Sequence, residues 1–488
     1  MTDFDVIVVG SGNAALCAGI AAAERGSKVL MLEKANEALS GGNTKYTAGA
    51  MRFAYESGEA LLPLITNQDD PRLPKTDFGS YDKDAFTADL LKFNDGKPLS
   101  PEQETLVNES YATLLWLSGH DVKFEPIYSR QSFEKDDKHV FWGGLTLAAH
   151  NEGVGLFDQE FAAFKGLGGT IRYNSGVTGL TSDDERVTGV RVGDETLTAN
   201  AVILACGGFE SNDAMRLERM GAGWDKAKVR GTPHNTGDGL TMALDLGAVE
   251  HGFYGGCHAT PMDLHMAPYG NLDIDPGERK HYRKICYFLG EMLNLRGERF
   301  VDEGADFRNY TYAQYGRAVL EQPEHTAWQF FDNKVKDLLY AEYHFHDAHF
   351  IESDTLEGLI EKIHDIDKAA AKKTLEEFNA AVDESTPFDP TIKDGKAADL
   401  SLPKSHWAQK LDSPPYRAYP VTGGITFTYG GVRVDERGAV LREDASPING
   451  LFACGEMVGG VFFHGYPGGS GLTSGAVFGR RAGLGAAS

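Results

Sequence analysis

The sequence predicts an α/β fold, and three observations in its first 33 residues lead to that prediction. An apolar run over 5–9 is typical of a buried strand, and the glycine-rich turn Gly10-Ser11-Gly12 follows it. The alanine-rich stretch from Leu16 to Arg25 has the composition of a helix. A second apolar run over 28–32 then ends at Glu33. Strand, turn, helix and strand in this order form a βαβ unit of a parallel sheet.

Each part of this βαβ unit suits a dinucleotide ligand. Gly10 permits a tight turn, Gly12 lets the backbone approach a pyrophosphate, and Ala15 lets the helix lie close to the sheet. The free N–H groups and the positive dipole end of the helix face the phosphates. Glu33, about 20 residues on, is placed to accept hydrogen bonds from ribose hydroxyls. The unit therefore predicts an adenine dinucleotide site, for NAD or for FAD.

Two further segments extend this site. Ser40 to Gly49 follows the ribose acid with small and hydroxylated residues, which can wrap a phosphate and an isoalloxazine ring with backbone donors. Near the end of the chain, the glycine-rich segment 465–471 precedes a helix predicted over Thr473 to Ala482. A helix N-terminus behind so many glycines is a second place where backbone donors can touch a cofactor.

Composition and charge exclude several classes of partner. The 488 residues carry a formal net charge of −24, which argues against nucleic acid or an anionic membrane surface. The five cysteines lack CxxC spacing, so we expect reduced thiols rather than a disulfide framework or a metal site. No basic leader precedes the first strand and no apolar run reaches about 18 residues, so we expect a cytoplasmic protein without stable membrane insertion.

The middle of the chain has a different texture. From about residue 251 to 401 it is more aromatic and charged and poorer in glycine, and it holds no second phosphate loop. Helical spacing runs through 355–382, where one stripe is apolar: Leu356, Leu359, Ile360 and Ile363. We therefore expect one domain formed by 1–250 and 402–488, and a second domain inserted as 251–401.

Short motifs rich in small residues are spread over nearly the whole chain. They are Gly10-Ser11-Gly12 to Glu33, Gly41-Gly42-Asn43-Thr44, Ala205-Cys206-Gly207-Gly208, Gly237-Asp238-Gly239, Gly430-Gly431-Val432, Ala453-Cys454-Gly455-Glu456 and Gly468-Gly469-Ser470-Gly471-Leu472. In this combination the chain resembles the fumarate reductase/succinate dehydrogenase flavoprotein superfamily. Within that superfamily it is most similar to FAD-dependent tricarballylate dehydrogenases, on the stretches 12–18, 207–212, 230–232, 315–317 and 425–429.

The resemblance implies a discontinuous Rossmann-like FAD-binding domain with an inserted α+β capping domain. It implies that Glu456 binds the ribityl or ribose region of FAD, and that the loop from Gly468 to Leu472 faces the pyrimidine end of the flavin. Some members attach FAD through a histidine after the first βαβ unit. Residues 43–46 contain no histidine, so we expect noncovalent FAD. Asp238 is interpreted either as a helix cap or as a hydrogen-bond anchor near the flavin edge.

The candidate cofactor-binding residues share these loops and strand ends. They are Gly10, Gly12, Asn13, Ala14, Ala15, Glu33, Lys34, Gly41, Gly42, Asn43, Thr44, Gly49, Val177, Ala205, Cys206, Gly207, Asp238, Gly455, Glu456, Gly471 and Leu472.

Hydride transfer to flavin N5 beside a carboxylate needs cations, a proton acceptor and a dry cleft. The resemblance implies a proton-transferring arginine after an Arg-Phe-x-Asn-Glu stretch, and here Arg308 follows Arg299 to Glu303 one residue late. Arg317 is the alternative, where tricarballylate dehydrogenases also show a Tyr-x-x-Tyr/Trp-Gly-Arg pattern. Because arginine is normally locked in its protonated form, each of the two could instead clamp a carboxylate or form a surface salt bridge. His258 matches the family's strand at the cap boundary, and it could bind a carboxylate, shuttle a proton or be structural.

Two departures from the family pattern bear on the substrate. Phe427 stands where fumarate reductases carry a histidine, and Tyr466 stands where they carry a second substrate arginine. Both departures remove donors to a C4 dicarboxylate, so fumarate and succinate are not the expected substrates. Tyr429 and Tyr466 resemble the tyrosines that handle the proton in 3-ketosteroid dehydrogenases of the same superfamily. They are candidates for acid/base chemistry, for a hydrogen bond to substrate, or for packing alone.

The sequence thus predicts an FAD-dependent dehydrogenase or reductase acting on a CH–CH bond next to a carboxylate. Its expected partners are a tricarballylate-like polycarboxylate and an external electron acceptor. A 3-ketosteroid or cyclic-ketone desaturase or reductase is the first alternative. The second is a non-catalytic FAD-binding electron-transfer subunit, which would have no need of Arg308, Arg317 and His258.

Overall fold

The computed structural model describes residues 2–183, 186–271 and 282–488. The chain forms two compact units: unit 1 comprises Met1–Met220, Gly231–Cys257 and Phe427–Ser488, and unit 2 comprises Gly221–Arg230 and His258–Thr426. Two long strands, β14 (Glu250–Asp263) and β18 (Tyr416–Val432), run through both units. The assignment of 1–250 and 402–488 to an FAD-binding domain, and of 251–401 to a capping domain, stays a prediction.

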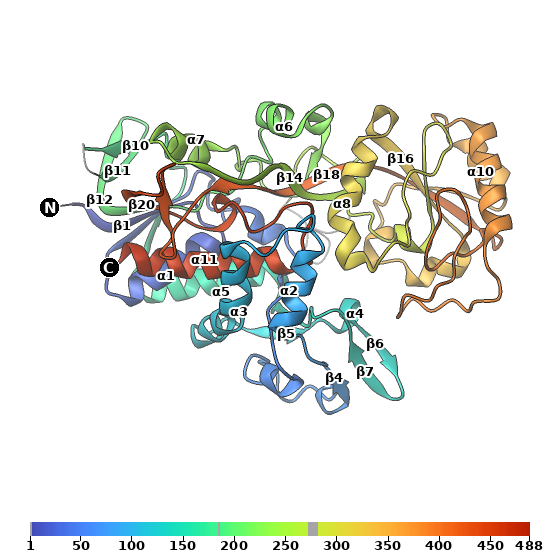
Figure 1. Cartoon of the computed structure of the whole chain (residues 1–488), viewed down its shortest axis with the longest axis horizontal. Helices are drawn as coiled ribbons and strands as arrows, with labels where there is room; N and C mark the ends of the chain where they lie inside the picture. The colour runs from blue at the N-terminus through green and yellow to red at the C-terminus, as the bar shows by residue number, and fades with distance from the viewer. Residues whose placement is uncertain (1, 184–185, 272–281) are drawn as a thin grey trace. The chain divides into compact units, whose positions relative to one another are not determined.

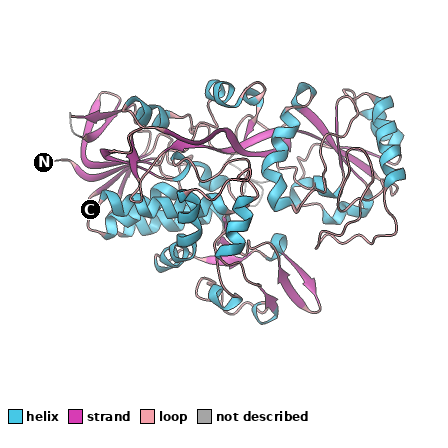
Figure 2. Ribbon diagram, in the orientation of Figure 1, coloured by secondary structure: helices cyan, strands magenta, loops and turns pink. Residues whose placement is uncertain are grey.

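A sheet of eight strands forms the centre of unit 1 (Figures 1 and 2). Its strands are β1 (Phe4–Val9), β2 (Val29–Leu32), β9 (Thr170–Arg172), β10 (Gly179–Ser182), β11 (Val187–Val192), β12 (Glu195–Leu204), β19 (Ala439–Leu441) and β20 (Pro447–Ala453). β1 pairs in parallel with β12 and β2, and the parallel set continues to β20 beyond β12 and to β9 beyond β2. β2 is buried along its whole length, as expected for a parallel strand covered on both faces.

The predicted βαβ unit is confirmed. Its helix, α1 (Asn13–Glu24), begins three residues before the predicted Leu16, directly after the turn. α1 lies alongside α11 (Ser470–Ala486), within which the predicted helix over 473–482 falls (Figure 1). Glycines on one face of α11 let the two backbones approach closely. A Cβ atom at Gly479 would lie 2.4 Å from the Ala14 carbonyl oxygen, which is too close for any side chain.

Other helices and small sheets complete unit 1. The helices are α2 (Lys83–Leu91), α3 (Pro101–Gly119), α4 (Tyr128–Gln131), α5 (Glu152–Gly166), α6 (Asp213–Met220) and α7 (Asp238–Asp245). One three-stranded sheet contains β3 (Ala50–Met51), β5 (Phe124–Pro126) and β8 (Leu147–Ala149). A second contains β4 (Thr76–Asp77), β6 (Ser132–Lys135) and β7 (Lys138–Phe141). α3 begins with a capping box, in which Ser100 and Gln103 bond each other's backbone N–H groups.

Unit 2 is built on β18 and the strands that pair with it. Its strands, besides parts of β14 and β18, are β13 (Lys228–Val229), β15 (Glu291–Asn294), β16 (Thr326–Phe331) and β17 (Ile351–Ser353). Its helices are α8 (Arg308–Leu320), α9 (Leu356–Lys362) and α10 (Lys368–Ala381). The apolar stripe predicted in 355–382 is confirmed, because Leu359, Ile360 and Ile363 are buried against Trp328 and Phe330 of β16. Burial of such side chains contributes about 1.5–3 kcal/mol each.

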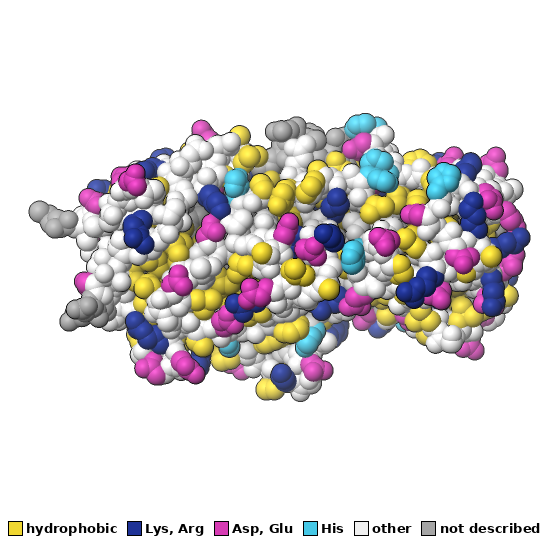
Figure 3. Space-filling view, turned by 90° about the horizontal axis from the view of Figure 1, so that it is seen from above, with side chains coloured by type: hydrophobic (Ala, Val, Ile, Leu, Met, Phe, Trp, Pro, Cys, Tyr) yellow, Lys and Arg dark blue, Asp and Glu magenta, His cyan; other side chains and the backbone are white. Residues whose placement is uncertain are grey.

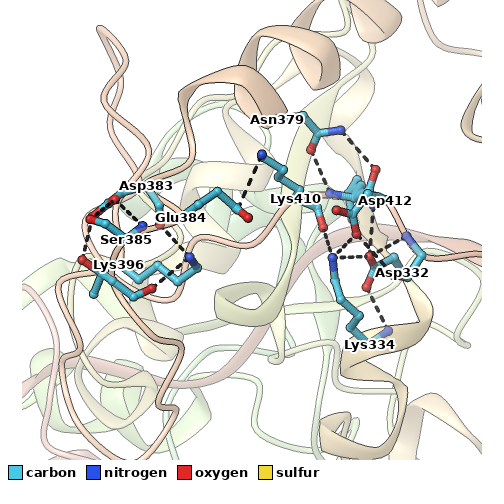
Figure 4. Close-up of polar contacts among 12 residues, drawn as sticks. Asp332, Lys334, Asn379, Asp383, Glu384, Ser385, Lys396, Lys410 and Asp412 are labelled. Atoms are coloured by element: carbon cyan, nitrogen blue, oxygen red, sulfur yellow. Dashed lines mark hydrogen bonds and ion pairs between the residues drawn. The ribbon is translucent and has the colours of Figure 1, made fainter.

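A network of polar contacts fixes the chain beyond β16 and α10 (Figure 4). The Asp332 carboxylate accepts hydrogen bonds from the backbone N–H groups of Lys334, Asp412 and Ser413, at 3.0, 3.2 and 3.1 Å. Asn379 of α10 exchanges two hydrogen bonds with the backbone of Leu411. These contacts hold the strand-to-helix connections of unit 2 and have no evident chemical role.

Charged side chains are distributed over the surface. On the face shown in Figure 3, acidic and basic side chains are interspersed, with small groups of hydrophobic side chains between them. Among the described ranges, no helix combines the length and the hydropathy needed to cross a lipid bilayer.

Candidate active site

The N-terminus of α1 joins the three loops that the sequence singled out. The Asn13 N–H donates to Thr44 Oγ1 at 2.9 Å, and the Asn13 side-chain amide donates to the Leu472 carbonyl oxygen at 2.8 Å. The fingerprint turn, the loop after β2 and the loop before α11 therefore meet at one helix end, where backbone donors and the helix dipole favour an anionic group.

Glycine is required at two strand ends beside this helix. Gly10, at φ +106°, follows β1, and a Cβ atom there would lie 2.4 Å from the Ala205 carbonyl oxygen. Gly455, at φ +68°, follows β20, and a Cβ atom there would lie 2.6 Å from the Ala14 side chain. Both positions combine a left-handed backbone with no room for a side chain. The result is a cradle of closely packed backbone at the carboxyl ends of parallel strands, the place where a dinucleotide binds in such folds.

Glu33 stands at the end of β2, as a ribose-binding acid requires. Its side chain is buried and accepts hydrogen bonds from Ser11 Oγ and, at 2.7 Å, from the Ala35 N–H. Ser11 Oγ in turn accepts the Gly41 N–H at 3.0 Å. Because each carboxylate oxygen can accept two hydrogen bonds, these contacts leave capacity for a ligand hydroxyl.

Asp238 is not a helix cap. The N-cap position of α7 is taken by Gly237 in the left-handed conformation, and no side chain caps this helix. Asp238 is instead the first helical residue, and its carboxylate accepts from Lys34 Nζ at 2.8 Å and from Thr236 Oγ1 at 2.9 Å. The hydrogen-bond anchor remains as the interpretation of Asp238, and it stays a prediction together with the role of Lys34.

Glu456 belongs to a buried polar cluster that also contains Glu210. Glu456 Oε1 accepts the N–H and the hydroxyl of Thr428 at 2.6 and 2.9 Å, while Glu210 Oε1 accepts the side-chain amides of Asn43 and Asn235 at 2.7 and 2.6 Å. Burial, followed by the negative charge of Glu456, raises the pKa of Glu210 well above its ordinary value. The Asn43 side chain helps to hold this cluster together through its hydrogen bond to Glu210. The composition of the loop from Ser40 to Gly49 did not reveal this role.

The remaining predicted cofactor-binding residues also lie in unit 1. Gly49 faces backbone atoms of Glu152, which a Cβ atom would approach to 2.6 Å, and Val177 is buried. Burial raises the pKa of the Cys206 thiol to about 12, so this cysteine is neutral. Gly12, Gly42 and Gly207 lie in the loops and strand ends described above. Ala15 lies in the first turn of α1, and Gly471 lies in the first turn of α11.

Four aromatic rings form a cluster in unit 1 where the sequence departs from the family pattern. The Phe427 ring lies 5.4 Å from Tyr429, 5.3 Å from Tyr466 and 5.8 Å from Phe462, measured between centroids. Phe462 also contacts both tyrosines, and its own contribution was not predicted. Tyr429 and Tyr466 are buried. The two candidate tyrosines thus share one apolar environment at the start of the loop before α11.

In unit 2, Arg308 and His258 both lie near Tyr312. Arg308 is the first residue of α8, and Tyr312 and Gly316 follow it at successive turns on the same face. Gly316 packs against the backbone of β14 at Ala259 and Thr260, so this face of α8 points at that strand. The Tyr312 ring lies 4.9 Å from the His258 ring, and the Arg308 guanidinium lies 5.8 Å from the Tyr312 ring centroid.

His258 is a neutral imidazole. Its side chain is only 1% exposed. Burial and then the positive charge of Arg230, with a smaller effect of Arg283, hold the pKa of His258 well below its ordinary value. His258 can therefore donate or accept a hydrogen bond, but it does not offer a positive charge to a carboxylate near neutral pH.

Arg308 is a permanent cation. Burial lowers its pKa, but the neighbouring phenol and thiol groups together more than offset this, so the pKa of Arg308 lies above its ordinary value. These groups are, in order of effect, Tyr340, Tyr312, Cys286 and Tyr287. The guanidinium lies 5.1 Å from the Tyr340 ring centroid. These surroundings favour a carboxylate clamp over a proton acceptor.

Arg317 does not join this group. It follows Arg308 by nine residues, which is about half a turn around an α-helix, so it projects from the opposite face of α8. Its guanidinium lies 5.2 Å from the Trp224 ring centroid. Helical spacing alone could have separated the two arginines, because only one can share a face with Tyr312.

The cradle in unit 1 defines a class of protein. Glycine-lined strand ends beside a helix N-terminus, followed by a buried acid, are typical of a dinucleotide-binding α/β enzyme. Among the described residues, no group of three or more His, Cys, Asp or Glu side chains could hold a metal ion.

The chain belongs to the family described as FAD binding domain, whose model matches residues 5–473. FAD is therefore the cofactor, and the protein is an FAD-dependent oxidoreductase of the class that acts on CH–CH bonds. The fold prediction of a mixed α/β flavoprotein is confirmed.

The relatives include fumarate reductases and steroid dehydrogenases. The chain is 29% identical to a probable fumarate reductase of Shewanella frigidimarina, over 99% of this chain and 74% of the relative. It is 26% identical to a 3-oxosteroid 1-dehydrogenase of Mycolicibacterium smegmatis, over 97% of this chain and 95% of the relative.

The similar solved structures include one protein of each kind. The open conformation of a flavocytochrome c3 fumarate reductase matches with a TM-score of 0.71 and 25% identity, over 99% of this chain and 78% of that one. A 3-ketosteroid delta1-dehydrogenase from Sterolibacterium denitrificans matches with a TM-score of 0.72 and 21% identity, over 99% of both chains. At that identity the second likeness shows the fold alone.

Proposed function

We propose that the protein transfers hydride between FAD and a CH–CH bond α,β to a carboxylate, in a tricarballylate-like polycarboxylate. The observation that carries this proposal is the group formed by Arg308, Tyr312 and His258 in unit 2. A permanently charged guanidinium beside a neutral imidazole suits a substrate that brings its own negative charge. Bound FAD supplies the hydride acceptor at N5.

Each side chain has a distinct part in this proposal. Arg308 binds the carboxylate beside the reacting bond and stabilises negative charge that develops on it. His258, neutral at physiological pH, holds the same group by a hydrogen bond. Tyr466 or Tyr429 moves the proton at the α carbon, because both phenols lie in the apolar cluster with Phe427. An external partner accepts electrons when the protein acts as a dehydrogenase and donates them when it acts as a reductase.

A 3-ketosteroid or cyclic-ketone desaturase is the second candidate. The aromatic cluster favours it, since four contiguous rings can bury an apolar ring system and two of them carry a hydroxyl group. The relatives named 3-oxosteroid 1-dehydrogenase support it as well. The positive charge at Arg308 favours an acid instead, because a neutral ketone does not compensate a buried cation.

Anaerobic mixing of the FAD-loaded protein with single compounds separates the candidates. We expect tricarballylate to bleach the flavin absorbance, and a 3-ketosteroid of the type oxidised by the relatives to leave it unchanged. Bleaching by the steroid alone would replace the proposed function by the second candidate. If no compound bleaches the flavin in either direction of the reaction, a non-catalytic electron-transfer subunit becomes the better account.

A further inference from the structure

Arg283 is a buried arginine of unit 2 that the sequence motifs did not single out. It pairs with Met262 in a β-bridge beside β14, four residues beyond His258, and the next residue donates its N–H to the Pro261 carbonyl oxygen at 3.0 Å. Its side chain is buried, with a relative exposure of 6% for the residue. A pair of basic residues, Arg283-Lys284, in a chain of net charge −24 is the signal that could have drawn attention to it.

The surroundings of Arg283 satisfy only some of its hydrogen-bond donors. One terminal nitrogen binds Glu342 Oε1 at 3.0 Å. Its Nε–H is buried and meets no acceptor among the described residues, and the same holds for the Nε–H of Arg308. A buried charged donor without an acceptor is costly, so two such donors in one region indicate that acceptors arrive with a ligand.

Arg283 and Arg308 act on the same surroundings. Burial raises the pKa of the Cys286 thiol, and the positive charges of Arg308 and Arg283 both act against that rise. Arg283 also contributes to the low pKa of His258, after burial and Arg230. The contacts agree: the Arg308 guanidinium lies 5.1 Å from the Tyr340 ring centroid, and Arg283 binds Glu342, two residues further along the chain, at 3.0 Å. Both guanidinium groups therefore contact the same short segment of unit 2.

We infer that Arg283 binds a second carboxylate of the substrate, while Arg308 holds the carboxylate next to the reacting bond, so that Arg283 selects polycarboxylates over monocarboxylates. This inference rests on the proposed function. The ligand class is an aliphatic acid with at least two carboxylates.

The test measures binding of three acids to the FAD-loaded protein by perturbation of the flavin spectrum. The acids are tricarballylate, succinate and butanoate, with three, two and one carboxylates. We expect Arg283→Gln to weaken the binding of tricarballylate and succinate at least about tenfold, which corresponds to the loss of one charged hydrogen bond. The affinity for butanoate should stay within about twofold of the wild-type value. Arg308→Gln weakens all three acids, because each uses the carboxylate beside the reacting bond.

Loss of Arg283 also leaves Glu342 without its partner, so the design needs a variant that keeps the fold. Arg283→Gln combined with Glu342→Gln removes both charges of the pair, and it must show the same change of selectivity. Arg299→Gln is the matched control, because Arg299 forms a comparably buried pair with Glu303 elsewhere in unit 2. We expect Arg299→Gln to lower stability without changing the ratio of affinities among the three acids.

Two outcomes overturn the inference alone. If Arg283→Gln and the double variant bind all three acids with wild-type ratios, Arg283 does not select carboxylates, although the proposed function stands. If wild-type protein binds butanoate as tightly as tricarballylate, there is no second carboxylate site. A wild-type protein whose spectrum responds to no acid refutes the proposed function itself, and the inference with it.

Discussion

The cofactor cradle of unit 1 and the cationic group of unit 2 are assembled in opposite ways. The cradle is made of backbone: Gly10 and Gly455 let neighbouring segments pack closely, and the helix end beside Asn13 supplies donors. The cationic group is made of long side chains, Arg308 and Arg283, held by aromatic rings and one carboxylate. A backbone site tolerates almost no added atom, whereas a side-chain site can be retuned by single substitutions. The cofactor is therefore expected to be fixed in this fold and the substrate to be adjustable.

The largest expected effect lies in the cradle. Gly10→Ala places a Cβ atom 2.4 Å from the Ala205 carbonyl oxygen at a backbone angle that favours glycine. We expect the flavin-to-protein ratio after purification to fall at least about tenfold. Gly26→Ala is the control, since Gly26 has a similar positive φ but no atom within 4 Å. Equal FAD content in both variants would show that the strand end at Gly10 does not limit the cofactor.

A smaller effect is expected in the aromatic cluster. Tyr466→Phe removes one hydroxyl group while keeping the ring against Phe427 and Phe462. If Tyr466 moves the proton, flavin reduction by tricarballylate slows about 100-fold while FAD content is unchanged. Stopped-flow absorbance gives the rate, and Tyr429→Phe serves as the parallel variant. A rate within about twofold of wild type for both variants would assign the cluster to packing.

A stability effect of a few degrees is expected from a buried acid in unit 2. Burial raises the pKa of Glu291 to about 8 in the folded protein, whereas the pKa of a glutamate in the unfolded chain is about 4.3. The stability that neutral Glu291 contributes is therefore fully present below about pH 4.3 and is lost as the pH rises through 8. Wild-type protein should therefore lose thermal stability between pH 5.5 and 9, and Glu291→Gln should lose less, by about 2–4 °C. Glu376→Gln, on the exposed surface of α10, is the control. An identical pH dependence in wild type and Glu291→Gln would contradict the assigned protonation.

The sequence predicted unit 1 well because its signals are local. The βαβ unit occupies consecutive residues, and the helix over 473–482 was predicted from the glycines before it. The polar cluster around Glu456 was missed in part, because Asn43 and Glu210 are 167 positions apart and only the fold brings them into contact. Asp238 was open to two interpretations because a carboxylate near a helix start resembles a cap until the N-cap residue is known.

Unit 2 was harder to predict for the same physical reason. Its strands pair across long intervals, so no short motif reports that Arg283 lies beside the strand that carries His258. Arg308 and Arg317 could not be ranked from the motif, but the structure places Arg317 against Trp224, on the other face of α8. Nothing in the local sequence indicates a role for Phe462, because its place in the aromatic cluster depends on contacts with three rings that the fold brings near it.

The division of labour between the two units is tested most directly by one comparison of arginine variants. FAD-loaded Arg308→Gln and Arg317→Gln proteins are mixed anaerobically with tricarballylate, and the rate of flavin bleaching is recorded. We expect full FAD content in both variants, bleaching slowed at least about 100-fold in Arg308→Gln, and a rate within about threefold of wild type in Arg317→Gln. Wild-type bleaching by Arg308→Gln, or loss of bleaching in Arg317→Gln alone, would contradict the assignment of the substrate carboxylate to Arg308.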